Sequence, residues 1–288
     1  MTINHIAILY PSGNTTALVF DDIPIKLYRE VNDFILEVEP AVEVVMFVNL
    51  LGTRPLGVMA GGEFCINATR SFGYYLMEGK SGLIDVNVGV VDKPLTVNIQ
   101  NNKSKVIINT PDFLKSVELI DDSVAIVKLN GISHLIIDSS SIKTQEFLNT
   151  EDIYIRKKIA TNLLYEYHLN DELTCGVMVV SNNGTEKRIF PYVHSKLLDD
   201  WYAETACGSG SLATAIAQAK RDNKSVEQLV LQQPSGSDLT IKVALSNYSF
   251  FESSVEGDVE LLYEGGFSRN FQSKVRHKRI NNVHKFSQ

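Results

Sequence analysis

The chain has 288 residues and a formal net charge of −7, with 44% hydrophobic and 21% charged residues. This composition is ordinary for a globular protein with a substantial core. The acidic excess argues against nucleic-acid and anionic-membrane partners, and no apolar run reaches the 18 residues that span a bilayer. Three cysteines, and an N-terminus without a basic residue before its apolar stretch, predict a cytoplasmic protein with free thiols.

The first half of the sequence predicts strands and turns with one prominent helix. From residue 68, apolar residues at 72, 75 and 76 keep helical spacing, and a glycine at 79 lies where a helix would end. A turn is expected at residues 11–14 (PSGN). Apolar or alternating runs predict strands at residues 6–10, 15–20, 42–51, 84–91, with a break at Pro94, and 106–109.

The second half predicts a similar plan. A helix is expected over residues 152–167, and another follows residues 207–210 (CGSG) and ends with Lys220 and Arg221, where the helix dipole favours cations. This weak internal duplication concerns structure, not sequence identity. Strands are expected at residues 124–129, 135–137, 177–180, 189–193, 226–232, 239–244 and 259–263.

A cysteine precedes one helix in each half. The loops are residues 60–70 (AGGEFCINATR), with Cys65, and residues 204–211 (ETACGSGS), with Cys207. A helix N-terminus carries unpaired amides and partial positive charge, so we expect a thiol there to have a pKa lowered towards neutrality. The same amides can bind a carboxylate. Two opposed sites of this kind favour stereoinversion: one thiolate removes an α-proton, and the other thiol protonates the opposite face.

Other interpretations of the cysteines remain open. Cysteine is often an inert core residue, and we expect this for Cys175. Cys65 and Cys207 could also be core residues or form a disulfide. Nothing indicates a cofactor, because the sequence has neither a dinucleotide-binding glycine motif nor a His/Cys cluster with metal-ligand spacing.

The two cysteine motifs resemble those of the diaminopimelate epimerase superfamily, which includes proline and histidine racemases. Residues 63–70 (EFCINATR) fit its first motif, except that Ile66 replaces a glycine, and residues 207–210 fit its Cys-Gly-Ser/Thr-Gly motif. Gly13-Asn14 and residues 131–134 (GISH) match two further elements in the family order, so that the resemblance spans about residues 6–267.

The resemblance implies an α/β (α+β) fold of two pseudo-symmetric domains, each a mostly antiparallel sheet wrapped around a central helix. We expect residues 1–118 to form the first domain with Cys65, and residues 119–267 the second with Cys207, its last strand packing back towards the first. Residues 268–288 would be a basic, solvated tail, and two chains would form a homodimer. The expected catalytic residues are Cys65 and Cys207, and the expected substrate-binding residues are Asn14, Ile66, Asn67, His134, Glu204, Gly208 and Ser209.

The departures from the family pattern concern the substrate. Diaminopimelate epimerases bind the distal end of their substrate with a Glu-Arg pair and Asn residues, but residues 198–204 (LDDWYAE) contain no Arg, and Ile132 replaces one Asn. Pro191, Trp201 and Glu204 resemble the histidine-racemase branch instead. We therefore expect cofactor-independent racemisation of a free amino acid, with histidine as substrate and Trp201 near it, although Trp201 could be a core residue. The alternatives are a diaminopimelate epimerase, a relative that isomerises or dehydrates small acids, and a non-catalytic binding protein, which Ile66 would favour.

Overall fold

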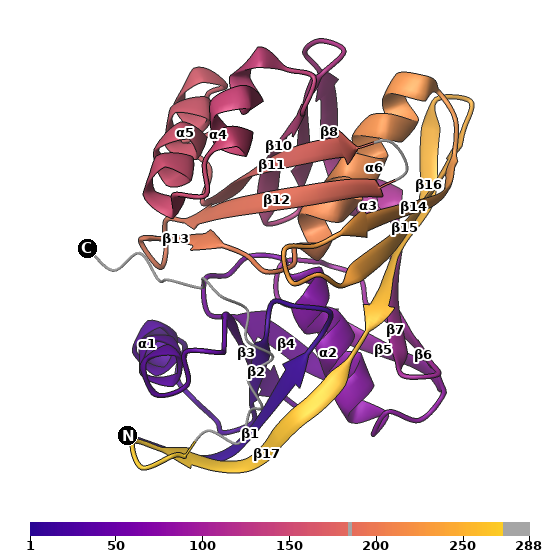
Figure 1. Cartoon of the computed structure of the whole chain (residues 1–288). Helices are drawn as coiled ribbons and strands as arrows, with labels where there is room; N and C mark the ends of the chain where they lie inside the picture. The colour runs from indigo at the N-terminus through magenta and orange to yellow at the C-terminus, as the bar shows by residue number, and fades with distance from the viewer. Residues whose placement is uncertain (184–185, 273–288) are drawn as a thin grey trace.

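The computed structural model describes residues 1–183 and 186–272, and Figure 1 shows two lobes, one around helix α2 and one around helix α6. The helical segments are η1 (Ile25–Leu27), α1 (Tyr28–Val38), α2 (Ile66–Leu76), α3 (Thr110–Phe113), η2 (Ile142–Thr144), α4 (Gln145–Asn149), α5 (Ile153–Glu166) and α6 (Gly208–Asp222). None of the described helices is long and apolar enough to cross a membrane.

The strands form one continuous chain of pairings. In the first half they are β1 (Thr2–Tyr10), β2 (Thr16–Val19), β3 (Val44–Asn49), β4 (Leu56–Met59), β5 (Gly82–Val88), β6 (Leu95–Gln100) and β7 (Lys103–Asn109). The strands that follow along the chain are β8 (Leu114–Leu119), β9 (Val124–Leu129), β10 (Ile132–Asp138), β11 (Thr174–Asn183), β12 (Glu186–Ser195), β13 (Asp200–Ala203), β14 (Val226–Gln232), β15 (Asp238–Ser246), β16 (Ser249–Asp258) and β17 (Glu260–Ser268).

The pairing pattern of the first half recurs in the second. From β1 to β7, neighbouring strands pair antiparallel, parallel, antiparallel, parallel, antiparallel and antiparallel. The series β9, β10, β11, β12, β14, β15, β16 follows the same sequence of directions. Helix α2 lies between β4 and β5, and α6 lies between the equivalent strands β12 and β14. The structural duplication and the mostly antiparallel α/β fold expected from the sequence are therefore confirmed.

Each half also donates a strand to the other. Strand β17 follows the second half along the chain but pairs antiparallel with β1. Strand β8 follows the first half but pairs antiparallel with β9. The expected division after residue 118 falls within β8, so the reciprocal exchange joins the two halves at the point where we expected a boundary. In Figure 1, β16 and β17 run from the α6 lobe to the α2 lobe.

The central helices are buried because their sequences suit enclosure by a sheet. Residues 208–217 of α6 are all buried, and small residues dominate this run. A Cβ added at Gly73 of α2 would lie 2.6 Å from the Val97 side chain of β6, so the glycine permits a close approach of helix and strand. Because both helices are fixed so closely, their first turns are held in place by the core of each lobe.

Several elements were not predicted from the sequence. Helix α1 is absent from the expected set, although Val31, Phe34, Ile35 and Val38 have helical spacing and the first three are buried. Strands β4, β8, β13 and β16 were also missed. The expected strand at residues 84–91 ends at Val88, and a separate strand, β6, begins after Pro94. Residues 273–288 of the expected basic tail lie outside the described residues.

Candidate active site

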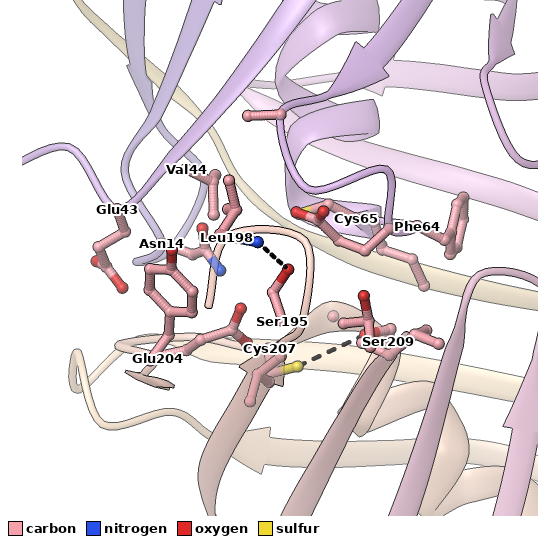
Figure 2. A pocket seen from close by; sticks show the side chains of 18 of the residues that line it. Asn14, Glu43, Val44, Phe64, Cys65, Ser195, Leu198, Glu204, Cys207 and Ser209 are labelled. Atoms are coloured by element: carbon pink, nitrogen blue, oxygen red, sulfur yellow. Dashed lines mark hydrogen bonds between the residues drawn. The ribbon is translucent and has the colours of Figure 1, made fainter. Parts of the chain in front are cut away.

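The two sequence-predicted thiols lie at the N-termini of the two central helices. Cys65 is the N-cap of α2, and its Sγ accepts a hydrogen bond from the backbone N–H of Ala68 at 3.4 Å. Cys207 is the N-cap of α6, and its Sγ accepts from the N–H of Gly210 at 3.3 Å. Figure 2 shows the two cysteines on elements from different lobes, at the borders of one cavity. Both thiols and that of Cys175 are free.

The two helix N-termini approach each other closely where Gly208 faces Ile66. A Cβ added at Gly208 would lie 2.7 Å from the Cβ of Ile66. Because Gly208 has no side chain, the Ile66 side chain can pack directly against the backbone that follows Cys207. Ile66 itself lines the cavity, so this departure from the family motif forms part of the cavity wall.

The cavity between the thiols is lined by three carboxylic acids and by no Lys, Arg or His among the described residues. The acids are Glu43, Glu63 and Glu204. The remaining lining residues are Asn14, Asn32, Val44, Val45, Ala60, Phe64, Cys65, Ile66, Ile132, Thr174, Val193, Ser195, Leu198, Tyr202, Cys207, Gly208 and Ser209. A cavity with this lining offers acceptors to a cationic group but no charged partner to a second carboxylate.

The pKa of each thiol is raised, which contradicts the expected shift towards neutrality. Burial is the largest cause for Cys65, followed by the negative charge of Glu204. Burial also dominates at Cys207, followed by the charge of Glu204 and its hydrogen bond to the thiol. The amides of Ala68 and Gly210 lower the pKa values, but by less. Desolvation therefore outweighs the helix termini, which favours the thiol form of both cysteines.

Two of the cavity carboxyls also have raised pKa values and unpaired oxygens. Burial raises the pKa of Glu63 to about 7 and, with the charges of Glu43 and Glu63, the pKa of Glu204 to about 8. Oε2 of each group is buried without a hydrogen-bond partner, and so is Oδ1 of Asn14. Buried polar atoms are normally paired, so these three acceptors mark where a ligand with several donors would bind.

Five of the seven expected substrate-binding residues line the cavity: Asn14, Ile66, Glu204, Gly208 and Ser209. Asn67 does not line it, and its amide Nδ2 donates to the carbonyl of Ala206 at 3.2 Å. His134 is fully buried behind Ser209, and its Nε2 lies 3.0 Å from the Ser209 Oγ. These two side chains therefore contact residues of the site and do not contact the cavity.

His134 and Ser209 form a chain that ends at a thiol. The Ser209 Oγ lies 3.6 Å from the Cys207 Sγ, as Figure 2 shows. Burial lowers the pKa of His134 to about 3, so that the ring is neutral at physiological pH. Its Nδ1 has no partner, and an unpaired acceptor is less costly than an unpaired donor. The proton is therefore assigned to Nε2, which donates to Ser209 and leaves the hydroxyl proton free for the sulfur.

Arg70, Trp201 and Cys175 belong to the framework. The buried guanidinium of Arg70 donates to Ser104 O at 2.8 Å, Asp258 O at 3.1 Å and the Asn67 Oδ1 at 3.0 Å. Trp201 is in the core of the second half and stacks on His194 with ring centroids 5.0 Å apart. Cys175 is buried in β11. Of the neighbouring aromatic residues Trp201 and Tyr202, the one that lines the cavity is Tyr202, and Trp201 has the core position that the sequence left open as its alternative.

The sequence did not reveal several residues of the site. Glu43 precedes β3, Ser195 is the last residue of β12, and Leu198 belongs to the connection between β12 and β13. No motif distinguishes them, because they meet the thiols only through the tertiary fold. Glu63 belongs to the first cysteine motif and could have been selected as a second acid beside a thiol.

Comparisons with known proteins agree with this geometry. The family described as "Histidine racemase CntK N-terminal domain" matches residues 3–267. Histidine racemase from Fusobacterium nucleatum subsp. nucleatum (strain ATCC 23726) is 26% identical over 275 residues, which cover 88% of this chain and 93% of that protein. A second strain of the same organism has a histidine racemase that is also 26% identical, over 269 residues.

Two solved structures show the same fold at low sequence identity. A phenazine biosynthesis protein of the PhzF family from Bacillus anthracis has a TM-score of 0.60 and 11% identity, covering 93% of this chain and 99% of that one. A hydroxyproline epimerase from Agrobacterium vitis, with bound trans-4-hydroxy-L-proline, has a TM-score of 0.59 and 8% identity, covering 94% and 93%. The chain thus belongs to the family of the histidine racemase CntK N-terminal domain, and it is an isomerase of the amino-acid racemase and epimerase type.

Proposed function

We propose that this isomerase racemises free histidine without pyridoxal phosphate, using Cys65 and Cys207 as two bases. The observation that carries the proposal is the pair of thiols at two facing helix N-termini, which border one cavity with three unpaired acceptors. A core role for the cysteines would not explain why both thiols adjoin the same acidic cavity.

The proposed reaction balances with one proton removed and one delivered. One cysteine, as thiolate, takes the α-proton and becomes a thiol. The other, as thiol, donates a proton to the opposite face of the α-carbon and becomes a thiolate. First-turn amides of α2 and α6 would bind the α-carboxylate and stabilise the charge that spreads into it as the carbanion forms. No electron is exchanged, and the product is the enantiomer of the substrate.

Because the pKa values of both thiols are raised, we infer that a thiolate forms only when the substrate is bound. Glu204 hydrogen-bonds the Cys207 thiol and has a pKa of about 8. A cationic substrate in the cavity would favour negative charge on the carboxyl and thiol groups around it. We propose that Glu204 accepts the Cys207 proton when the substrate supplies this charge, so that the ionisation belongs to the pair and not to one residue.

The lining of the cavity supports histidine over diaminopimelate. Histidine brings an α-ammonium and an imidazole with up to two N–H donors, and Glu63, Glu204 and Asn14 each present an unpaired acceptor. Diaminopimelate would bring a second carboxylate, and the described lining holds no Lys, Arg or His to pair with it. An unpaired buried charge is costly, and a site without partners discriminates strongly against it.

A direct substrate comparison tests this proposal. Protein dialysed against a chelator and treated with hydroxylamine, which removes pyridoxal phosphate, would be incubated with L-histidine, D-histidine or meso-diaminopimelate. Chiral chromatography measures the products. We expect interconversion of the histidine enantiomers and little turnover of diaminopimelate. Faster turnover of diaminopimelate would contradict the substrate assignment, and activity only in untreated protein would contradict independence from the cofactor.

We further propose that the enzyme is cytoplasmic, as its three free cysteines suggest, and that it forms a homodimer, as the family resemblance implies. Light scattering on the purified protein would then give twice the mass of one chain. A monomer at micromolar concentration would contradict this.

A further inference from the structure

A buried hydrogen-bond cluster from the first half holds the two residues that precede Cys207. The Glu43 Oε2 accepts from the backbone N–H of Thr205 at 2.9 Å, and the Glu43 Oε1 accepts from the Thr205 hydroxyl. The same hydroxyl oxygen accepts from the backbone N–H of Asn14 at 2.7 Å. Thr205 therefore has both its polar side-chain functions and its amide satisfied by the opposite half of the molecule.

Ala206, the next residue, is held from the same side. Its carbonyl accepts from Asn14 Nδ2 at 3.0 Å and from Asn67 Nδ2 at 3.2 Å. The Asn67 amide cannot turn over without loss, because its Oδ1 accepts from Arg70 at 3.0 Å. Across the segment, Gln233 of the second half accepts from the Cys207 N–H at 3.0 Å. The residues before the thiol are thus fixed between the two halves.

The position of Glu43 in this cluster disfavours its charged form, because the carboxyl is removed from water. Burial raises its pKa, and the only effects that lower it are hydrogen bonds from Thr205, Thr15 and Asn14. Thr205 of the other half donates two hydrogen bonds to the Glu43 carboxylate, and Thr15 of the same half donates one. A carboxylate removed from water is tolerated when such donors surround it, so separation of the halves would leave Glu43 without the two hydrogen bonds from Thr205.

We propose that Glu43 is a positioning residue, which acts through Thr205 to hold the Cys207 thiol in place against the first half of the molecule. The contact of Glu43 with Thr205 forms only when the two halves are together. It therefore couples assembly of the two-thiol site to the approach of the halves. Its carboxylate is fully engaged, so it leaves substrate recognition to Glu63, Glu204 and Asn14.

This inference rests on the proposed two-thiol function. Paired substitutions test the positioning role of Glu43 separately from the two-thiol reaction. Thr205→Val keeps the shape of the side chain but removes the donor to Glu43 and the acceptor for Asn14, whereas Thr205→Ser keeps both. Glu43→Gln places an NH2 group against either Thr205 N–H or Thr15 N–H, whichever way the amide is turned. Glu39→Gln is the control, because Glu39 is a buried carboxylate near Glu43 in the sequence but accepts from Ala41 within its own half.

The first readout does not depend on racemase activity. Alkylation by iodoacetamide would be followed by mass spectrometry at each of the three cysteines. We expect Thr205→Val and Glu43→Gln to label Cys207 several-fold faster than the wild type, Thr205→Ser or Glu39→Gln. Cys175, buried in β11, should stay protected in all of them and so exclude general unfolding. Unchanged labelling of Cys207 would overturn the proposal, whether or not the protein racemises histidine.

The second readout is the split between kcat and KM for histidine. Loss of hydrogen bonds to a buried charged group is expected to lower kcat about ten- to a hundredfold in Thr205→Val and Glu43→Gln, with KM changed much less. Thr205→Ser should restore most of the rate, and Glu39→Gln should match the wild type. Faster labelling of Cys207 with an unchanged kcat would overturn the positioning role while leaving the two-thiol reaction intact.

Discussion

The two thiol sites occupy equivalent places in a duplicated fold but have different surroundings. Cys65 is partly exposed and has Glu63 two residues before it, whereas Cys207 is buried and contacts both Ser209 and Glu204. Both sites have a helix with a cysteine as its N-cap. In each of them the sulfur accepts one hydrogen bond from a backbone amide of the first turn. The acids and hydroxyls around the sulfur are not shared. Pseudo-symmetry thus sets the positions of the two thiols, and burial together with the neighbouring side chains sets their proton affinities.

This difference has a limit that thermodynamics imposes. Two enantiomers have equal free energy in water, so the forward and reverse kcat/KM values of a racemase must be equal. Unequal surroundings of Cys65 and Cys207 can therefore make kcat and KM differ between the two directions. The value of kcat/KM must still be the same in both directions. We expect the asymmetry to appear as different KM values for L- and D-histidine, with matching differences in kcat.

Removal of either thiol should have the largest effect. Cys65→Ser and Cys207→Ser each replace a thiol by a hydroxyl that is a far weaker acid, and general acid–base catalysis contributes about a hundred- to ten-thousandfold. We expect a loss of at least a hundredfold in the rate of histidine racemisation in both variants, measured by chiral chromatography. Cys175→Ser is the matched control. Full activity in either active-site variant would contradict the two-base scheme.

The acids beside the thiols should differ in importance. Glu204→Gln removes a carboxyl that contacts Cys207 directly, and we expect a loss of about ten- to a hundredfold in kcat/KM. Glu63→Gln should cost less, because Glu63 affects Cys65 only through its charge. In the wild type, kcat/KM should rise with pH up to about 8, where Glu204 ionises in the free enzyme. A variant Glu204→Gln with an unchanged pH profile would show that another group controls this limb.

The hydroxyl beside Cys207 should have a smaller effect, of a few-fold. Ser209→Ala removes the contact to the sulfur and leaves the His134 ring without its partner. Because one neutral hydrogen bond contributes about 0.5–1.5 kcal/mol, we expect kcat to fall about two- to tenfold. Steady-state kinetics measures it, with Ser225→Ala as the control, since the Ser225 hydroxyl donates to the carbonyl of Leu245, away from the cavity. An unchanged kcat in Ser209→Ala would separate this hydroxyl from the thiol chemistry.

The acids should also make stability depend on pH, with a shift of a few degrees in the unfolding midpoint. The folded protein keeps the protons of Glu63 and Glu204 up to about pH 7 and 8, whereas the unfolded chain loses them near pH 4.3. The unfolded state then binds fewer protons between these values, so stability falls as pH rises through this window. Glu204→Gln should flatten the fall, which calorimetry from pH 5 to pH 9 would show. A variant as pH-dependent as the wild type would contradict the raised pKa of Glu204.

The sequence was informative wherever the signal is local. A cysteine followed by small residues and helical periodicity identified the first turns of α2 and α6, and the two motifs placed Cys65 and Cys207 correctly at the helix starts. The recurrence of one helix per half also anticipated the duplicated strand pairing. Helix α1 was predictable by the same periodicity and was overlooked.

Features that depend on tertiary contacts were not predictable. Glu43 reaches Thr205 across 162 positions of the sequence, and no local pattern encodes that contact. Trp201 and Tyr202 are neighbours on β13, where successive side chains alternate between faces, so only the fold decides which one lines the cavity. The direction of the thiol pKa shift was wrong for the same reason. The helix terminus is visible in the sequence, but the burial that outweighs it is not.

Solvent deuterium tests most directly whether the two thiols act on opposite faces of one carbon. L-histidine would be turned over in deuterated water for a small fraction of one conversion, and the α-deuterium content of both enantiomers measured after chiral separation. Because the donating thiol exchanges with solvent before each turnover, we expect fully α-deuterated D-histidine beside L-histidine that still carries protium. Deuterium appearing equally fast in the recovered L-histidine, or D-histidine that retains the original proton, would contradict this expectation.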